Sequence, residues 1–125
     1  LRWTSPRRLW IDVPSYAIRE AVDCLFGRLG ARLSTATGFD AADAIEILYH
    51  FVFDPLGVVA TVRVRLRDRE RPEIDSVAGR LPAADWIERE MNDLLGIRFR
   101  GHPDPRRLLL CDDWPEGVHP LRRQA

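Results

Sequence analysis

The sequence predicts an α+β fold in which helices pack on one face of a largely antiparallel sheet. Two observations carry this prediction. Residues 45–53 and 58–67 alternate between two faces on either side of a turn at residues 54–57, which is typical of a β-hairpin. Residues 15–29 and 83–95 repeat apolar side chains at helical spacing. Two one-sided helices are therefore available to cover the hydrophobic face of the hairpin, giving a two-layer domain.

The alternation also predicts the register of the hairpin. A slip of one residue would turn Arg63 and Arg65 toward the core. The predicted cross-strand pairs are Phe53 with Val58, Phe51 with Ala60, Tyr49 with Val62, and Glu46 with Arg65. The second face of the hairpin mixes apolar and basic groups, which suits contact with a partner, and it carries Leu48, His50, Val52, Val59, Thr61 and Arg63.

The remaining segments give weaker signals. Residues 32–39 predict a strand of small polar side chains, and residues 73–77 predict one more short strand. Residues 1–14 interleave arginine with tryptophan, and we expect an arm that packs on a partner or frays. The whole chain, residues 1–125, is expected to be a single domain ending in an extended interface segment, residues 101–125.

Composition excludes several functional classes. Acidic and basic residues both number 19, so the formal net charge is zero and nothing favours nucleic acid or an anionic membrane. No apolar run is long enough to span a bilayer. Cys24 and Cys111 are isolated, which favours a reducing compartment and speaks against an iron–sulfur cluster bound by this chain.

No pattern in the chain marks a catalytic or metal site. The glycines form neither a dinucleotide-binding turn nor a phosphate-binding loop. His50, His102 and His119 lack metal-ligand spacing, and Glu88 and Glu90 point away from each other on a helix. We therefore expect no catalytic residue, cofactor ligand or metal ligand in this chain.

Glu90 stands out on the second helix. On a helical wheel it falls between Trp86 and Leu94, within the apolar arc, whereas Glu88 falls opposite. A carboxylate in that position is costly to bury without a cation. We predict that Glu90 pairs with Arg106 or Arg107; the alternative is that it reaches solvent at the helix edge.

The last third of the chain resembles the thirty-kilodalton subunit family of respiratory complex I, which is the C subunit of NADH-quinone oxidoreductase. That family also contributes a subunit or domain to membrane-bound hydrogenases of the formate hydrogenlyase type. The residues that carry the resemblance are Glu88-Arg89-Glu90, Asp93-Leu94-Leu95-Gly96-Ile97, Gly101-His102-Pro103-Asp104, Arg106-Arg107-Leu108-Leu109-Leu110, Asp112-Asp113-Trp114 and His119-Pro120-Leu121-Arg122. The chain departs from the family pattern at Met91-Asn92 and at Arg122-Arg123-Gln124.

The resemblance implies a non-catalytic structural or assembly role in a membrane-associated electron-transfer complex, peripheral and on the cytoplasmic side. Implied partners are the forty-nine-kilodalton, D-type subunit or a hydrogenase large subunit, together with small iron–sulfur subunits. FMN, iron–sulfur clusters or a nickel–iron centre would belong to those partners and not to this chain. The implied interface residues are Arg106, Arg107, Trp114, His119 and Arg122.

Three functions stay open at this point. The chain could serve an NADH dehydrogenase or a formate hydrogenlyase-type hydrogenase, which share this fold. It could also be an unrelated protein-binding module that uses the second sheet face or the N-terminal arm.

Overall fold

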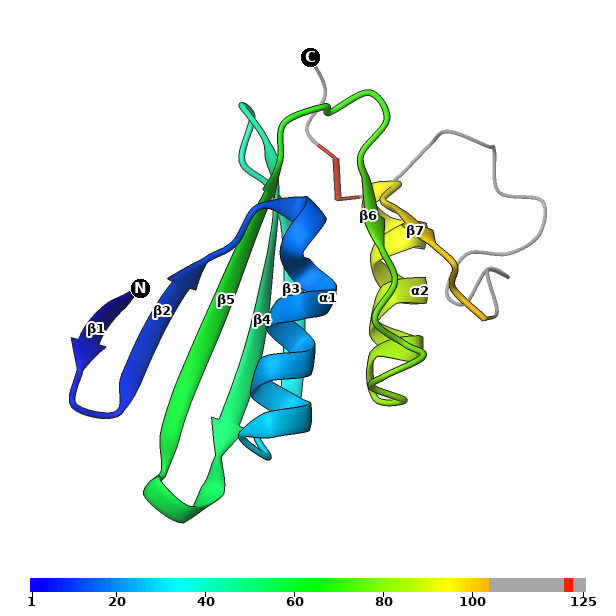
Figure 1. Ribbon diagram of the computed structural model, residues 1–125. Helices are drawn as coiled ribbons and strands as arrows, with labels where there is room; N and C mark the ends of the chain where they lie inside the picture. The colour runs from blue at the N-terminus through cyan, green and yellow to red at the C-terminus, as the bar shows by residue number, and fades with distance from the viewer. Residues whose placement is uncertain (104–120, 123–125) are drawn as a thin grey trace.

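The fold centres on a five-stranded sheet with the strand order β1-β2-β5-β4-β3 (Figure 1). The computed structural model describes residues 1–103 and 121–122. The strands are β1 Arg2–Ser5, β2 Arg8–Asp12, β3 Arg32–Asp40, β4 Ile45–Phe53 and β5 Val58–Leu66. Neighbouring strands are antiparallel except β2 and β5, which are parallel. With two helices packed against this sheet, the predicted α+β class is confirmed.

The hairpin of β4 and β5 has the predicted register. All four expected pairs occur, and the salt bridge between Arg65 Nε and Glu46 Oε2 spans 2.9 Å. Gly57 closes the connecting turn with a φ of 61°, a conformation that favours glycine. The turn therefore fixes the register that the alternating side chains require.

The first helical segment has three kinds of turn. A 3₁₀ turn at Ser15–Ala17 leads into α1, Ile18–Val22, and a π-helical turn follows at Asp23–Arg28. Ile18, Val22 and Leu25 are buried, but Phe26 and Leu29 are exposed, contrary to the predicted apolar face. A π turn holds more residues than an α turn, so side chains after Leu25 rotate away from the sheet.

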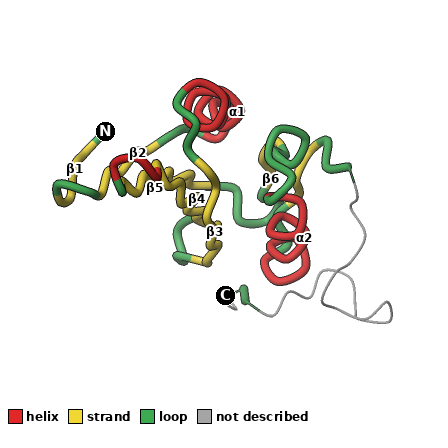
Figure 2. The backbone as a smooth tube through the Cα atoms, turned by 90° about the horizontal axis from the view of Figure 1, so that it is seen from below, coloured by secondary structure: helices red, strands yellow, loops and turns green. Residues whose placement is uncertain are grey.

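The second helix, α2, spans Ala84–Leu95 and ends at Gly96, whose φ of 77° is left-handed. The flanking strands β6, Glu73–Asp75, and β7, Arg98–Arg100, form a separate two-stranded parallel sheet. The strand β7 escaped prediction because Phe99 is its only buried residue. Figure 2 shows α1 over one face of the main sheet and α2 with β6 beside the β3 edge.

The N-terminal residues are part of the main sheet. We expected an arm over residues 1–14, but β1 and β2 extend the sheet beyond β5. The parallel pairing sets Leu9 opposite Ala60 and Ile11 opposite Val62, on the face that packs against the core. The arm prediction failed because a parallel pair joins strands that are far apart in the sequence.

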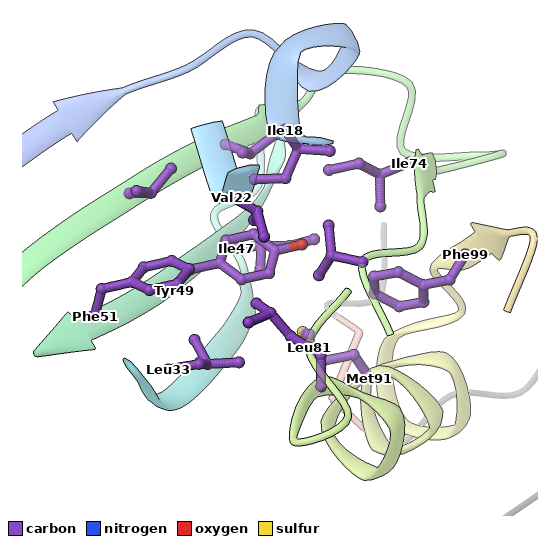
Figure 3. Close-up of a cluster of buried hydrophobic side chains, with 14 of the residues drawn as sticks. Ile18, Val22, Leu33, Ile47, Tyr49, Phe51, Ile74, Leu81, Met91 and Phe99 are labelled. Carbon is purple, nitrogen blue, oxygen red and sulfur yellow. The ribbon is translucent and has the colours of Figure 1, made fainter. Parts of the chain in front are cut away.

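A continuous hydrophobic core joins the two layers (Figure 3). Tyr49 and Phe51 of β4 lie between Val22 of α1 and the side chains that α2 and β6 contribute. Among the described residues, no helix has the length and hydrophobicity needed to cross a membrane.

Gly38 on β3 permits the close packing of α2. A Cβ at this position would lie 2.7 Å from Leu95 Cδ1 and 3.0 Å from Met91 Sδ. Because both contacts belong to buried side chains, Gly38→Ala is expected to lower the free energy of unfolding by about 1–3 kcal/mol. Gly79→Ala is the matched control, since nothing lies within 4 Å of its added Cβ. Equal effects of the two substitutions in chemical denaturation would contradict this packing argument.

Candidate functional site

A buried carboxylate on α2 organises the region that carries the family resemblance. Glu88 is 1% exposed and accepts hydrogen bonds at both oxygens. Ser76 Oγ donates to Oε1 over 2.5 Å, and the backbone N–H of Val77 donates to Oε2 over 2.9 Å. Ser76 Oγ in turn accepts the N–H of Ala78 over 3.1 Å. Glu88 therefore joins α2 to the chain that leaves β6.

His102 completes this group, which we call the Glu88 cluster (Ser76, Val77, Glu88 and His102). Its side chain is almost fully buried, and Nε2 lies 3.1 Å from the backbone oxygen of Asp85 and 3.8 Å from Glu88 Oε1. A carbonyl oxygen only accepts, so Nε2 carries the proton in this contact. The cluster thereby fixes the turn at Gly101–Pro103 against the start of α2.

Burial sets the ionisation of the cluster. Removal from water raises the pKa of Glu88 above its ordinary 4.5, while the hydrogen bonds from Ser76 and Val77 and the nearby His102 oppose that rise. Burial, with the negative charge of Glu88 as a second cause, also raises the pKa of the Tyr49 hydroxyl. Tyr49 is thus neutral, in keeping with its place in the core.

The raised pKa of Glu88 predicts a pH-dependent stability. A protonated Glu88 stabilises the fold fully below pH 4.5, and this contribution is lost as pH rises through the folded-state pKa. Glu88→Gln removes the titration, so its stability deficit relative to wild type should shrink as pH rises from 4.5 to 7. Chemical denaturation at the two pH values measures this change, with Glu20→Gln on an exposed glutamate as the control. A deficit that grows with pH would contradict the assigned direction.

The helical-wheel prediction chose the wrong face at two positions of α2. Glu88, expected on the solvent side, is buried, whereas Trp86, expected in the core, is 58% exposed. Glu90 is only half-buried. Its predicted partners, Arg106 and Arg107, lie outside the described residues, so that pairing stays a prediction.

A second buried carboxylate lies at the end of β3 and forms the Asp40 cluster (Asp40, Arg69 and Arg122). The Asp40 side chain is 1% exposed. Arg69 donates from Nε to Oδ1 over 3.1 Å and from a terminal nitrogen to Oδ2 over 2.5 Å. Arg122 Nε lies 3.4 Å from Oδ2. Asp40 Oδ1 also accepts the N–H of Ala42, over 3.0 Å. The cluster connects the β3–β4 turn, the loop after β5 and the C-terminal segment.

Residues 121–122 also contact the end of α2. The N–H of Leu121 donates to the backbone oxygen of Leu94 over 2.9 Å, and Arg122 donates to that of Leu95 over 3.1 Å and to that of Arg69. These bonds satisfy carbonyls that a helix C-terminus leaves without intrahelical partners. Arg122 is therefore engaged within the chain, and its assignment to a partner interface stays a prediction.

The other predicted interface residues cannot be placed. Arg106, Arg107, Trp114 and His119 lie outside the described residues. Within the described part, no group of three or more histidine, cysteine, aspartate or glutamate side chains is arranged to hold a metal ion. What the described residues do supply is a rigid support, with His102 tied to the first turn of α2 and Arg122 to its last turn.

Sequence comparison assigns this architecture to a family. Residues 11–125 match the family described as the respiratory-chain NADH dehydrogenase, 30 Kd subunit. The chain belongs to this family. The resemblance to this family inferred from the signature residues is thereby confirmed, and an unrelated binding module is no longer supported.

Relatives from this family occur in two kinds of enzyme. The chain is 35% identical to formate hydrogenlyase subunit 5 of Escherichia coli K12 over 98% of its own length and 22% of the relative's. It is 42% identical to the NADH-quinone oxidoreductase C subunit of Moorella thermoacetica over 71% of its own length and 58% of the relative's. The chain thus spans less than two thirds of either relative.

A solved structure shows the same fold in a third setting. The chain superimposes with a TM-score of 0.81 and 28% identity on a chain of the membrane-bound sulfane sulfur reductase, an archaeal respiratory membrane complex. The match covers 97% of this chain and 73% of that one. These relatives and this neighbour belong to respiratory-type complexes with different substrates, and the shared fold is what they have in common.

Proposed function

We propose that this chain is a non-catalytic structural or assembly subunit, or domain, of a membrane-associated electron-transfer complex of the NADH:quinone oxidoreductase type. The family match over residues 11–125 carries the proposal. The same fold occurs in relatives named for NADH-quinone, formate and sulfane sulfur chemistry. A domain shared among such different reactions serves the architecture of the complex and leaves the chemistry to other subunits.

The C-terminal segment is the proposed contact with a large partner subunit. On either side of residues 104–120, the Glu88 and Asp40 clusters tie the chain to opposite ends of α2. A segment held at both ends loses less conformational entropy when it binds, which favours its use as an interface. The proposed anchors are Arg106, Arg107, Trp114 and His119. The proposed partner is the D-type subunit or a hydrogenase large subunit, with small iron–sulfur subunits nearby.

The proposed setting is peripheral, on the cytoplasmic side of the membrane. FMN, iron–sulfur clusters or a nickel–iron centre would reside in partner subunits, and this chain would bind none of them. Isolated Cys24 and Cys111 and the lack of metal-ligand spacing in the sequence support that division.

Substitutions in the segment test the proposed interface. Arg106→Ala and Trp114→Ala, each in a tagged full chain, should reduce recovery of the large subunit by about tenfold from gently solubilised membranes, because arginine and tryptophan concentrate interface energy. Thermal unfolding of the isolated chain should change little. Arg28→Ala, at an exposed arginine of the first helical segment, is the control. Undiminished recovery with both variants would contradict the interface.

A hydrogenase of the formate hydrogenlyase type is the second candidate. The match to formate hydrogenlyase subunit 5 extends over 98% of the chain, more than the 71% matched by the NADH-quinone oxidoreductase relative. Cofactor content of the purified complex separates the two candidates. FMN without nickel, with NADH-oxidising activity, indicates an NADH dehydrogenase, and nickel without FMN indicates a hydrogenase.

A further inference from the structure

One face of the main sheet is not covered by any described helix. α1 lies on the opposite face, and α2 lies beside the β3 edge (Figure 2). The uncovered face presents a half-buried apolar group made of Leu48, Val52 and Val59, which the register sets side by side on β4 and β5. Apolar side chains gathered on an open sheet face indicate a contact surface.

A basic–aromatic patch adjoins this apolar group. Its members are Arg2, Arg8, Trp10, His50 and Arg63. The guanidinium carbons of Arg2 and Arg63 lie 5.9 Å and 5.4 Å from the centre of the Trp10 ring, within the range of cation–π contacts. The strand register aligns Trp10 with Thr61 and then His50, whose Nδ1 lies 3.1 Å from Thr61 Oγ1.

The patch holds positive charge that the chain does not neutralise. Arg63 is consumed by Asp12, since Nε lies 2.5 Å from Oδ1, and this hydrogen bond lowers the pKa of Asp12. Within the described part of the chain, Arg2 and Arg8 have no carboxylate partner. Burial, followed by the charge of Arg8, lowers the pKa of His50, so its ring is neutral at pH 7. Two unpaired cations thus stand beside an apolar surface in a chain of zero net charge.

We propose that this face docks an acidic, amphipathic segment of a neighbouring subunit, whose carboxylates meet Arg2 and Arg8 and whose apolar side covers Leu48, Val52 and Val59. This surface is separate from the C-terminal segment and goes beyond the proposed function. Arg2, Arg8 and Trp10 also precede residue 11, where the family match begins, so the patch is not part of the matched family region.

The chemistry favours a protein over a polyanion. A phosphate backbone or an anionic lipid surface attracts extended clusters of cations, and the patch offers only Arg2 and Arg8 beyond its internal pairs. The adjoining apolar group, in contrast, needs a partner that removes it from water. Tryptophan and arginine are the side chains most enriched at the energetic centres of protein interfaces.

Photo-crosslinking in the assembled complex tests the proposal. A photoreactive amino acid replaces Val59 in the tagged full chain, the complex is isolated from irradiated native membranes, and the adduct is identified by mass spectrometry. We expect a peptide of another subunit that contains aspartate or glutamate. Arg2→Glu combined with Arg8→Glu should cut the adduct yield by about tenfold, because like charges then oppose each other. Arg28→Glu should leave the yield unchanged.

The control position is Phe26, an exposed apolar residue of the helical segment on the other side of the sheet. A lipid or nucleic acid adduct, a peptide without acidic residues, or equal yields of the same adduct from positions 26 and 59 would overturn the proposal. So would recovery of an intact complex in which neither position 59 nor position 48 forms an adduct. Because the complex is recovered through the tag, failure here is distinguishable from failure of the assembly role.

Discussion

Asp40→Ala is expected to lower the free energy of unfolding by about 2–4 kcal/mol, the largest effect of any single substitution considered for this chain. The buried carboxylate neutralises Arg69 and lies 3.4 Å from Arg122. Its removal leaves two guanidinium groups without their shared anion and the N–H of Ala42 without its acceptor. Both arginines keep some contact with water, with side chains 26% and 22% exposed, so the loss falls short of that for a fully buried pair.

Asp54→Ala is the matched control for Asp40. Asp54 also accepts two hydrogen bonds from one arginine, at 2.9 Å and 3.3 Å from Arg32, but both side chains are exposed. A solvated pair of this kind contributes under about 1 kcal/mol. Equal losses for the two variants in urea denaturation would show that burial does not give the Asp40 cluster its importance.

Glu88→Ala is expected to cost about 2–4 kcal/mol as well, for a different reason. The change leaves a cavity beside the core and removes the acceptor for Ser76 Oγ and the N–H of Val77. It should also loosen the turn at Gly101–Pro103, since His102 packs against the same carboxylate. Amide hydrogen exchange of residues 99–103, measured with thermal unfolding, reports both effects.

Glu20→Ala on α1 is the control for Glu88, because Glu20 is exposed and its replacement should change stability by less than about 0.5 kcal/mol. If Glu88→Ala were equally mild, or if exchange in residues 99–103 stayed unchanged, the Glu88 cluster would not be the support of this turn. The buried carboxylate would then be incidental to the fold.

Local patterns were enough to predict the central hairpin and both helices. The alternation around the turn at residues 54–57 specifies register directly, because each side chain has only two possible faces. The position of the N-terminal strands could not be predicted in the same way. β2 pairs in parallel with β5, across most of the first half of the chain, and no local signal encodes that partner.

The buried face of α2 was predicted wrongly for an identifiable reason. A helical wheel assumes one buried face, but α2 packs on two sides, with Met91 and Leu95 toward Gly38 of β3 and Glu88 toward Ser76 after β6. A polar residue can be buried on the second side because a hydroxyl and a backbone N–H meet it there. The pairing of Ser76 with Glu88 leaves no periodic trace in the sequence. The presence of Glu88 and His102 among the signature residues was the only available hint.

The central claim is that this chain supports the architecture of a respiratory-type complex. Its most direct test is purification of the tagged full chain from gently solubilised membranes of its native host, with the co-purifying chains identified by mass spectrometry. We predict a stoichiometric large subunit, of the D type or the hydrogenase type, together with small iron–sulfur subunits. Recovery of the chain as a stable monomer, with no subunit of a membrane complex, would contradict this claim.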